Sequence, residues 1–146
     1  MLVNEVGRVL VGKRLDMISD AWQMPQGGLD DGENADEALW REMHEEIGTI
    51  DADIVVRARQ WLTYEFPADL APKLWEGRFA GQTQMWYLLR FTGAEGDIDL
   101  NVHKAEFSTV KWVPPAELPG MVIWFKRDSY LSILQEFAEP LAALPP

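Results

Sequence analysis

Cysteine is absent from the chain of 146 residues. Its absence excludes disulfide bonds, thiol nucleophiles and zinc sites with cysteine ligands. No apolar run approaches the length of a membrane span, and no charged-then-apolar leader precedes the first strand pattern. The sequence therefore predicts a cytoplasmic protein with no membrane partner.

Positive charge is scarce in the chain. Lys and Arg together number 13 against 24 Asp and Glu, which gives a net charge of −11. A chain this acidic is not expected to bind nucleic acid through a general basic surface. If its substrate is a polyanion, the attraction must be local and must come from a metal ion and a few placed Lys and Arg side chains.

The rest of the composition is that of one globular domain over residues 1–146. Hydrophobic residues make up 47% of the chain and aromatic residues 11%, which is enough for a core at this length. Strand-like and helix-like segments mix without regular β–α–β alternation, which favours an α+β fold with a mixed sheet flanked by helices. We expect strands within 1–15, 54–66, 84–91 and 107–113, and helices at 35–47 and 126–137.

Two expectations concern the middle of the chain. Trp61 and Tyr64 are predicted to lie in the core. The polar segment 67–81, which carries Lys73 and Arg78, is predicted to be a loop, and loops this long in compact domains are often functional.

The helix at 35–47 has the clearest boundaries. Asn34 is a plausible N-cap with Glu37 as its capping-box partner, and Gly48 stands where a helix ends in a left-handed residue. An apolar row at four-residue spacing marks the buried side and comprises Ala35, Leu39, Met43 and Ile47.

Three glutamates crowd one side of this helix. Glu42, Glu45 and Glu46 fall within roughly 100° of arc at the helical rotation per residue. Like charges at this spacing repel, and a hard divalent cation relieves the repulsion because carboxylate oxygens suit Mg²⁺ or Mn²⁺. The alternative interpretation is an acidic face exposed to solvent.

The spacing of the fixed residues resembles the Nudix box, G-x5-E-x7-R-E-U-x-E-E-x-G-U, where U is a bulky apolar residue. The matching residues are Gly27, Glu33, Arg41, Glu42, Glu45, Glu46 and Gly48. Thr49 stands where the family has an apolar residue, a place that Ile50 could fill by a small shift. The resemblance implies the Nudix α/β/α sandwich and a metal-dependent hydrolysis of a phosphoanhydride bond in a nucleoside diphosphate linked to another group.

The resemblance also implies roles at the reacting centre. Glu42, Glu45 and Glu46 would hold the metal ions, with Glu106 and the Gly27 carbonyl as further candidate ligands. Either Glu46 or Glu106 could be the general base.

Other charged groups near the box are given lesser roles. Arg41 is expected to pair with Glu37 and Glu45 and so to orient a metal ligand. His44 and His103 are not expected to be ligands or bases.

Stretches outside the box are similar to the bacterial subgroup of RNA pyrophosphohydrolases and dinucleoside polyphosphate hydrolases. They are Trp22–Gly28, Trp61–Tyr64, Gly81–Tyr87, Glu106–Phe107 and Phe125–Arg127. By this resemblance the candidate substrate contacts are Lys13, Arg14, Gln84, Ile123, Phe125 and Lys126. Phe125 could instead be core, and Gln84 an ordinary polar residue on a strand face.

Three departures from the subgroup remove positive charge where a polyanion would bind. Met85 replaces a frequent lysine, and Thr63 and Glu65 replace residues that are often basic. Met1 already lies inside the first strand pattern, whereas relatives usually carry an arginine before that strand.

Three functions remain on this reading. The first is removal of pyrophosphate from 5′-triphosphorylated RNA, and the second is hydrolysis of a dinucleoside polyphosphate such as diadenosine tetraphosphate. The third, a nucleotide-binding regulatory module without turnover, is disfavoured because Glu42, Glu45 and Glu46 are all present.

Overall fold

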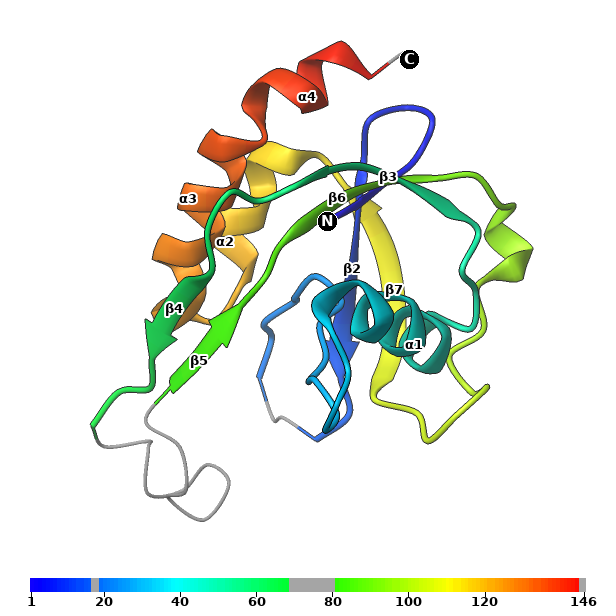
Figure 1. Cartoon of the computed structure of the whole chain (residues 1–146), viewed down its shortest axis with the longest axis horizontal. Helices are drawn as coiled ribbons and strands as arrows, with labels where there is room; N and C mark the ends of the chain where they lie inside the picture. Colours follow the sequence, from blue (N-terminus) through cyan, green and yellow to red (C-terminus); the bar gives the residue numbers. More distant parts are fainter. Residues whose placement is uncertain (17–18, 69–80, 145–146) are drawn as a thin grey trace.

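The computed structural model describes residues 1–16, 19–68 and 81–144, and Figure 1 shows its elements in chain order. The strands are β1 (Leu2–Val3), β2 (Val9–Arg14), β3 (Ala52–Arg57), β4 (Leu62–Glu65), β5 (Gly81–Gln84), β6 (Tyr87–Phe91) and β7 (Phe107–Val113). The helices are α1 (Ala35–Ile47), α2 (Leu118–Met121), α3 (Arg127–Glu136) and α4 (Ala138–Ala143), with 3-10 turns η3 (Glu95–Asp97), η4 (Pro115–Glu117) and η5 (Trp124–Lys126).

The central layer is a mixed sheet with strand order β3-β6-β1-β2-β7. β1 runs parallel to β6, and the other neighbours are antiparallel. Met1 directly precedes β1, and its amino group donates a hydrogen bond to the Tyr87 carbonyl at 2.7 Å. β4 and β5 pair only with each other and form a separate two-stranded ribbon.

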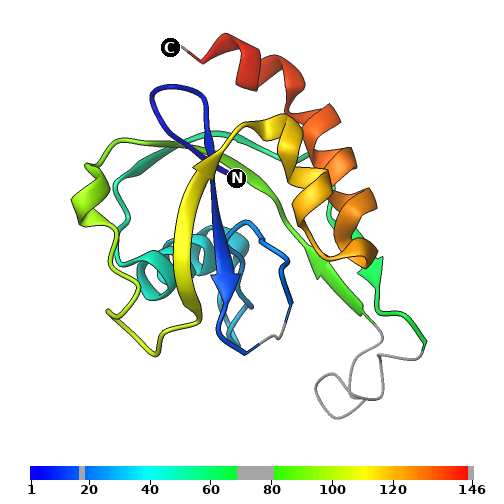
Figure 2. The same cartoon turned by 180° about the vertical axis from the view of Figure 1, so that it is seen from behind.

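Helices cover both faces of the sheet because successive strand residues point to opposite sides. On one face Leu10 of β2 packs with Met43 and Ile47 of α1. On the other face Val9 and Val11 pack with residues of α2 and α3, including Leu118, Tyr130 and Ile133. Figures 1 and 2 show α1 on one side of β2 and β7, and α2 and α3 on the other. The predicted α+β fold, a mixed sheet between helices, is confirmed.

Both ends of α1 are capped as the sequence predicts. The Asn34 side chain accepts a hydrogen bond from the Glu37 amide, and the Glu37 carboxylate accepts one from the Asn34 amide. Gly48 ends the helix in the left-handed region with φ of 76°, a conformation that glycine adopts at little cost.

Two strand predictions are wrong about continuity. The strand expected within 54–66 is divided, because β3 ends at Arg57 and β4 begins at Leu62. The strand expected at 84–91 is divided into β5 and β6, with Met85 and Trp86 between them. Both segments leave the main sheet at the same level, where the Ala58 amide donates a hydrogen bond to the Trp86 carbonyl at 2.8 Å. Beyond this bend, β4 and β5 therefore pair only with each other.

Side chains around the bend also depart from expectation. Trp61, predicted to be core, is 44% exposed because it lies in the turn before β4, whereas Tyr64 is buried as predicted. Thr49 is buried and its hydroxyl accepts from the Asp51 amide at 3.0 Å. Ile50 is exposed, so it does not replace the missing apolar residue of the box.

The C-terminal helical region is longer and more divided than predicted. α3 ends at Glu136, and α4 begins at Ala138 and contains Pro140 as its third residue. Proline is tolerated there because amides in the first helical turn have no partner inside the helix. None of the described helices is long and apolar enough to cross a membrane. The predicted loop residues Lys73 and Arg78 lie outside the described residues.

Candidate active site

The loop before α1 lies directly against the helix carboxylates. A Cβ atom placed on Gly27 would lie 1.9 Å from the Cδ atom of Glu42, so a side chain there would displace the Glu42 carboxylate. The equivalent atom on Gly28 would meet nothing within 4 Å. The glycine at 27 is therefore required for the backbone to approach the Glu42 carboxylate.

Arg41 ties the helix to this loop. Its guanidinium bonds bidentately to Glu33, with Nε–Oε2 at 2.7 Å and Nη2–Oε1 at 2.8 Å, and donates to the Gly28 carbonyl at 2.6 Å. Nη1 donates to Glu42 at 2.8 Å and to Glu45 at 3.1 Å. These charge-assisted bonds hold the pKa of Glu33 at about 2 and fix the directions of the two helix carboxylates.

The prediction for Arg41 is half right. Its bond to Glu45 is confirmed, but the expected pair with Glu37 is wrong because the Glu37 carboxylate caps the helix. Glu33 is the partner that the spacing rule missed, since it lies eight residues away and reaches Arg41 only through the turn of the loop. Its fixed place in the box was the available signal.

Glu46 is the buried acid of the site, with 4% of its surface exposed. It accepts a hydrogen bond from the Gln26 amide at 2.9 Å. Burial, followed by the charge of Glu106 and a hydrogen bond to it, raises the Glu46 pKa to about 9. Burial also raises the pKa of Glu42, although Arg41 opposes that shift. The acids are thus crowded and partly desolvated.

The arrangement of these acids bears on whether a divalent ion fits the site. Among the described residues, no three acidic, histidine or cysteine side chains converge as they stand on a point that could hold a metal. Two of the helix carboxylates instead point at Arg41. Glu42 is half-buried beside Glu46 and Glu106, so a cation would offset the cost of ionising these acids together, and the Gly27 backbone lies close to the Glu42 carboxylate. The donor set is all oxygen, which suits Mg²⁺ or Mn²⁺.

A groove of about 640 Å³ opens beside the carboxylates. Its lining includes Glu42, Glu46 and Glu106 from the acidic cluster, and Gln26, Gln82, Gln84, Met85 and Trp61 from the loop and the ribbon. Arg14 is the single cation among the described residues that line it. The groove is large enough for a nucleotide, and its walls beyond the acids are mostly neutral.

Amide side chains connect the groove wall to the acidic cluster. The Gln26 side chain donates to Gln82 at 3.4 Å and accepts from Gln84 at 3.1 Å and from Lys126 at 3.4 Å. Burial, followed by the charge of Arg14, lowers the pKa of Lys126 to about 8. Gln26 was not predicted, although its place between Pro25 and Gly27 could have indicated it.

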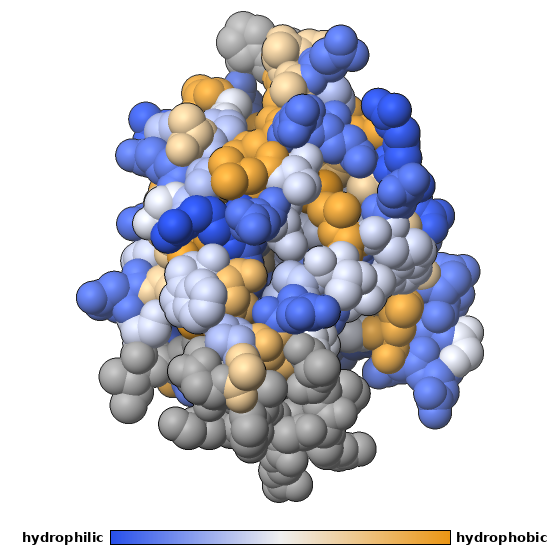
Figure 3. Space-filling model, turned by 90° about the vertical axis from the view of Figure 1, so that its left-hand side faces the viewer, coloured by the Kyte–Doolittle hydropathy of each residue, from blue (hydrophilic) through white to orange (hydrophobic). Residues whose placement is uncertain are grey.

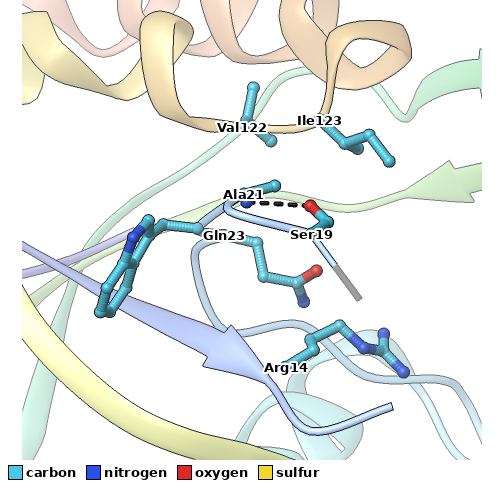
Figure 4. A pocket seen from close by; sticks show the side chains of 7 residues that line it. Arg14, Ser19, Ala21, Gln23, Val122 and Ile123 are labelled. Carbon is cyan, nitrogen blue, oxygen red and sulfur yellow. Dashed lines mark hydrogen bonds between the residues drawn. The ribbon is translucent and has the colours of Figure 1, made fainter. Parts of the chain in front are cut away.

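Figure 4 shows a smaller recess beside the groove, of about 10 Å³. Arg14 lies below it at the end of β2, Gln23 crosses its floor, and Ile123 and Val122 cover it from above. The Gln23 Nε2 atom is buried and has no hydrogen-bond partner within the described part of the chain. The recess has room for one water molecule, so a nucleobase could lie across its mouth but not inside it.

The predicted substrate residues are thus partly assembled. Arg14 lines both the groove and the recess, and its guanidinium bonds bidentately to Asp16 at 2.6 and 2.8 Å. Lys13 lines neither, and its ammonium lies 3.9 Å from Asp20. Phe125 packs against Tyr64 with ring centroids 6.1 Å apart. His44 and His103 are exposed and line neither hollow.

The buried Glu46 predicts a pH-dependent stability in the metal-free protein. The unfolded chain releases this proton near pH 4.5, but the folded chain keeps it up to about pH 9, so its contribution to the free energy of unfolding falls between these values. We expect Glu46→Gln to be as stable as the wild type near pH 4.5. At pH 8 it should be more stable by on the order of 4 kcal/mol.

Thermal unfolding in a chelator at several pH values measures this difference. The comparison with the variant is needed because burial lowers the pKa of the Met1 amino group to about 5, which stabilises the fold as pH rises over the same range. Parallel stability profiles for the two proteins would show that Glu46 is ionised in the fold.

Known proteins share both the sequence and the fold. The NUDIX domain family matches residues 1–133 of the chain. A protein of Roseobacter denitrificans named RNA pyrophosphohydrolase is 46% identical over 139 residues, which cover 94% of this chain and 87% of that protein. A Rickettsia bellii protein of the same name is 44% identical over 137 residues, which cover 94% and 85% respectively.

Solved structures resemble the fold at lower identity. The E. coli dihydroneopterin triphosphate pyrophosphohydrolase aligns with a TM-score of 0.69 at 21% identity and covers 92% of each chain. A C. elegans Ap4A hydrolase in a binary complex aligns with a TM-score of 0.66 at 18% identity and covers 95% of each chain. These likenesses confirm the fold alone.

Proposed function

The chain belongs to the Nudix family and is a Nudix pyrophosphohydrolase, and we propose that it removes pyrophosphate from the 5′-triphosphate end of RNA, leaving a monophosphate. The observation that carries this proposal is the match to RNA pyrophosphohydrolases at 44% to 46% identity along 94% of the chain. The carboxylate cluster beside a nucleotide-sized groove supports it. We also propose that residues 1–146 form one domain, and cytoplasmic location stays a prediction.

Nudix hydrolases need divalent metal ions. We propose Mg²⁺ or Mn²⁺ held by Glu42, Glu45, Glu46, Glu106 and the Gly27 carbonyl. A divalent ion supplies neutralisation of phosphate charge and lowers the pKa of a water molecule for attack. Glu42 and Glu45 accept hydrogen bonds from Arg41 and would present their remaining oxygens to the ion, while Arg41 is anchored separately on Glu33.

The chain's own residues would handle the proton of the attacking water. The charge of Glu106 adds to burial in raising the Glu46 pKa to about 9, so Glu46 can hold a proton at neutral pH. Glu46 is the buried member, and the Gln26 amide fixes one of its oxygens. We therefore propose Glu46 as the acceptor and Glu106 as the group that keeps it oriented. As a ligand and as an acceptor Glu46 would have to be deprotonated, a state that a bound divalent ion would favour.

A dinucleoside polyphosphate is the second candidate substrate. It contains the same phosphoanhydride bond, and the groove walls favour it in one respect. Arg14 is the single cation among the described lining residues, and Met85 and Gln84 are neutral. Such walls suit a nucleoside better than an additional run of phosphates. An inactive binding module is disfavoured because every acid of the box is present.

The test gives the purified protein triphosphorylated RNA and diadenosine tetraphosphate at matched Mg²⁺ concentrations and identifies the products. We expect pyrophosphate and 5′-monophosphorylated RNA, with a higher kcat/KM than for the dinucleotide. A preference for diadenosine tetraphosphate, with ATP and AMP as products, would assign the second function. Binding of either substrate without hydrolysis under both Mg²⁺ and Mn²⁺ would contradict both hydrolase assignments.

A further inference from the structure

Trp124 is exposed at the surface beside the recess. It exposes 61% of its surface, the largest fraction among the described aromatic residues, of which Trp61 is next at 44%. Indole is a large, rigid ring with a π-face that suits stacking. An exposed indole is informative where it is held in place and lies beside a substrate path, and Trp124 meets both conditions.

The ring is held by an aromatic cluster, which we define as Tyr64, Phe66, Trp124 and Phe125. Trp124 meets Phe125 edge to face, with centroids 5.7 Å apart and planes at 87°. Phe125 in turn packs against Phe66 at 6.0 Å and Tyr64 at 6.1 Å. Tyr64 and Phe66 are buried, so the cluster is anchored in the core through β4. Trp124 is therefore positioned before any ligand arrives, which lowers the entropy lost on stacking.

Its place in the chain puts Trp124 next to the recess. The preceding residue, Ile123, covers the recess from above in Figure 4, opposite Arg14. Arg14 lines both the groove and the recess, so with the first nucleotide in the groove the base of the second would lie across the mouth of the recess and touch Ile123. The third nucleotide would then meet the 3-10 turn η5. Trp124 is the first residue of that turn.

The charges around Trp124 suit a phosphate backbone. The exposed Arg127 directly follows η5, and its Nε donates to the Pro119 carbonyl at 3.2 Å. Arg14 lies across the recess. Lys126 is the cation at the cluster itself, with its ammonium 5.4 Å from the centroid of the Tyr64 ring, although the chain carries a net charge of −11.

The surrounding surface does not form a continuous apolar patch. Figure 3 views the side on which β4, β5 and α3 lie in Figure 1, and apolar patches there are separated by hydrophilic side chains. On α3, next to η5, Leu131 is exposed, but Arg127 and Asp128 lie between it and Trp124 in the chain. A protein partner would require a larger contiguous apolar surface, whereas a base needs one aromatic face and a nearby cation.

From these observations we propose that Trp124 is a stacking platform for a base downstream of the second nucleotide of single-stranded RNA. The proposal rests on the proposed function and deepens it, because it makes the substrate an RNA chain of at least three nucleotides. Trp124 contributes to binding and does not touch the reacting phosphates.

Two triphosphorylated RNAs, of two and of five nucleotides, test the proposal. For Trp124→Ala we expect KM for the five-nucleotide RNA to rise about 5- to 100-fold, the effect of losing one base stack, with kcat nearly unchanged. KM for the two-nucleotide RNA should stay within about twofold. Trp124→Phe should retain most of the affinity, since it keeps an aromatic face.

Leu131→Ala is the matched control, because it removes another exposed apolar side chain from the neighbouring helix. It should change neither KM. If Trp124→Ala raised KM equally for both RNAs, or raised it for neither, the proposal would be overturned.

A binding measurement separates this inference from the proposed function. Fluorescence anisotropy with a labelled, 5′-monophosphorylated five-nucleotide RNA needs no turnover. If the wild type hydrolyses no RNA but Trp124→Ala still weakens this binding, the proposed function fails and the stacking site stands. If the wild type hydrolyses RNA and the variant binds equally well, only the stacking site fails.

Discussion

Glu46→Gln is expected to lower kcat by roughly 10²- to 10⁴-fold while the protein stays folded. Glu46 is buried beside Glu42 and Glu106, so its carboxylate is both a proposed metal ligand and the proposed proton acceptor. Glutamine has nearly the same shape and keeps an oxygen for the Gln26 amide, which now bonds to Glu46 at 2.9 Å. It cannot accept a proton from water, and its neutral amide is a weak metal ligand.

Steady-state hydrolysis of triphosphorylated RNA with Mg²⁺ measures this loss. Glu37→Gln is the matched control on the same helix, because glutamine also serves in a capping box and Glu37 does not line the groove. The control should keep activity within a few-fold. The same Glu46 variant is expected to gain stability without metal at pH 8. Activity and stability therefore move in opposite directions, as expected for a strained catalytic acid. Full activity in Glu46→Gln would remove Glu46 from the mechanism.

The features that the sequence predicted well are local along the chain. The capping box at Asn34 and the left-handed Gly48 depend on residues within one or two turns of each other, and both are present. The apolar row of α1 packs on the sheet as its spacing requires. The spacing of residues within one helix determines which of them share a face, so such patterns predict structure without knowledge of the rest of the fold.

The features that the sequence missed depend on distant contacts. Trp61 looked like a core residue because it lies in a strand-like segment with Tyr64 and Phe66, but the chain bends there to leave the sheet. The bend at Met85 and Trp86 has the same origin, since β5 must follow β4. Neither residue is a proline or a glycine, so no local signal marks the break.

The candidate site shows the same division. The helix supplies Glu42, Glu45 and Glu46 at a spacing visible in the sequence. The partners that make Glu46 unusual come from elsewhere, since Gln26 bonds to it across 20 positions and Glu106 lies just before β7. Resemblance to the family pointed to Glu106, but only the fold shows that Glu106 lies close enough to raise the Glu46 pKa.

The second large effect is expected from Gly27→Ala, which should lower kcat/KM by about 100-fold. The added Cβ would lie 1.9 Å from the Cδ atom of Glu42, so either the loop or the carboxylate must move. Glu42 is held in place by Arg41 at 2.8 Å, and displacing it also disturbs the guanidinium that bonds to Glu45. A displacement of about 1 Å at a reacting centre is enough for a loss of this size.

The adjacent glycine provides the matched control. A Cβ on Gly28 would meet nothing within 4 Å, so Gly28→Ala adds the same methyl group in open space and should stay within a few-fold of the wild type. Because the Glu42 carboxylate, a proposed metal ligand, would be displaced, the Gly27→Ala variant should also need a higher Mg²⁺ concentration for its half-maximal rate, by roughly 10- to 100-fold. A Mg²⁺ titration of both variants measures this shift. If the two variants lose activity equally, the cause is a stiffer loop and not the contact between Gly27 and Glu42, and the Gly27 carbonyl then loses its main support as a metal ligand.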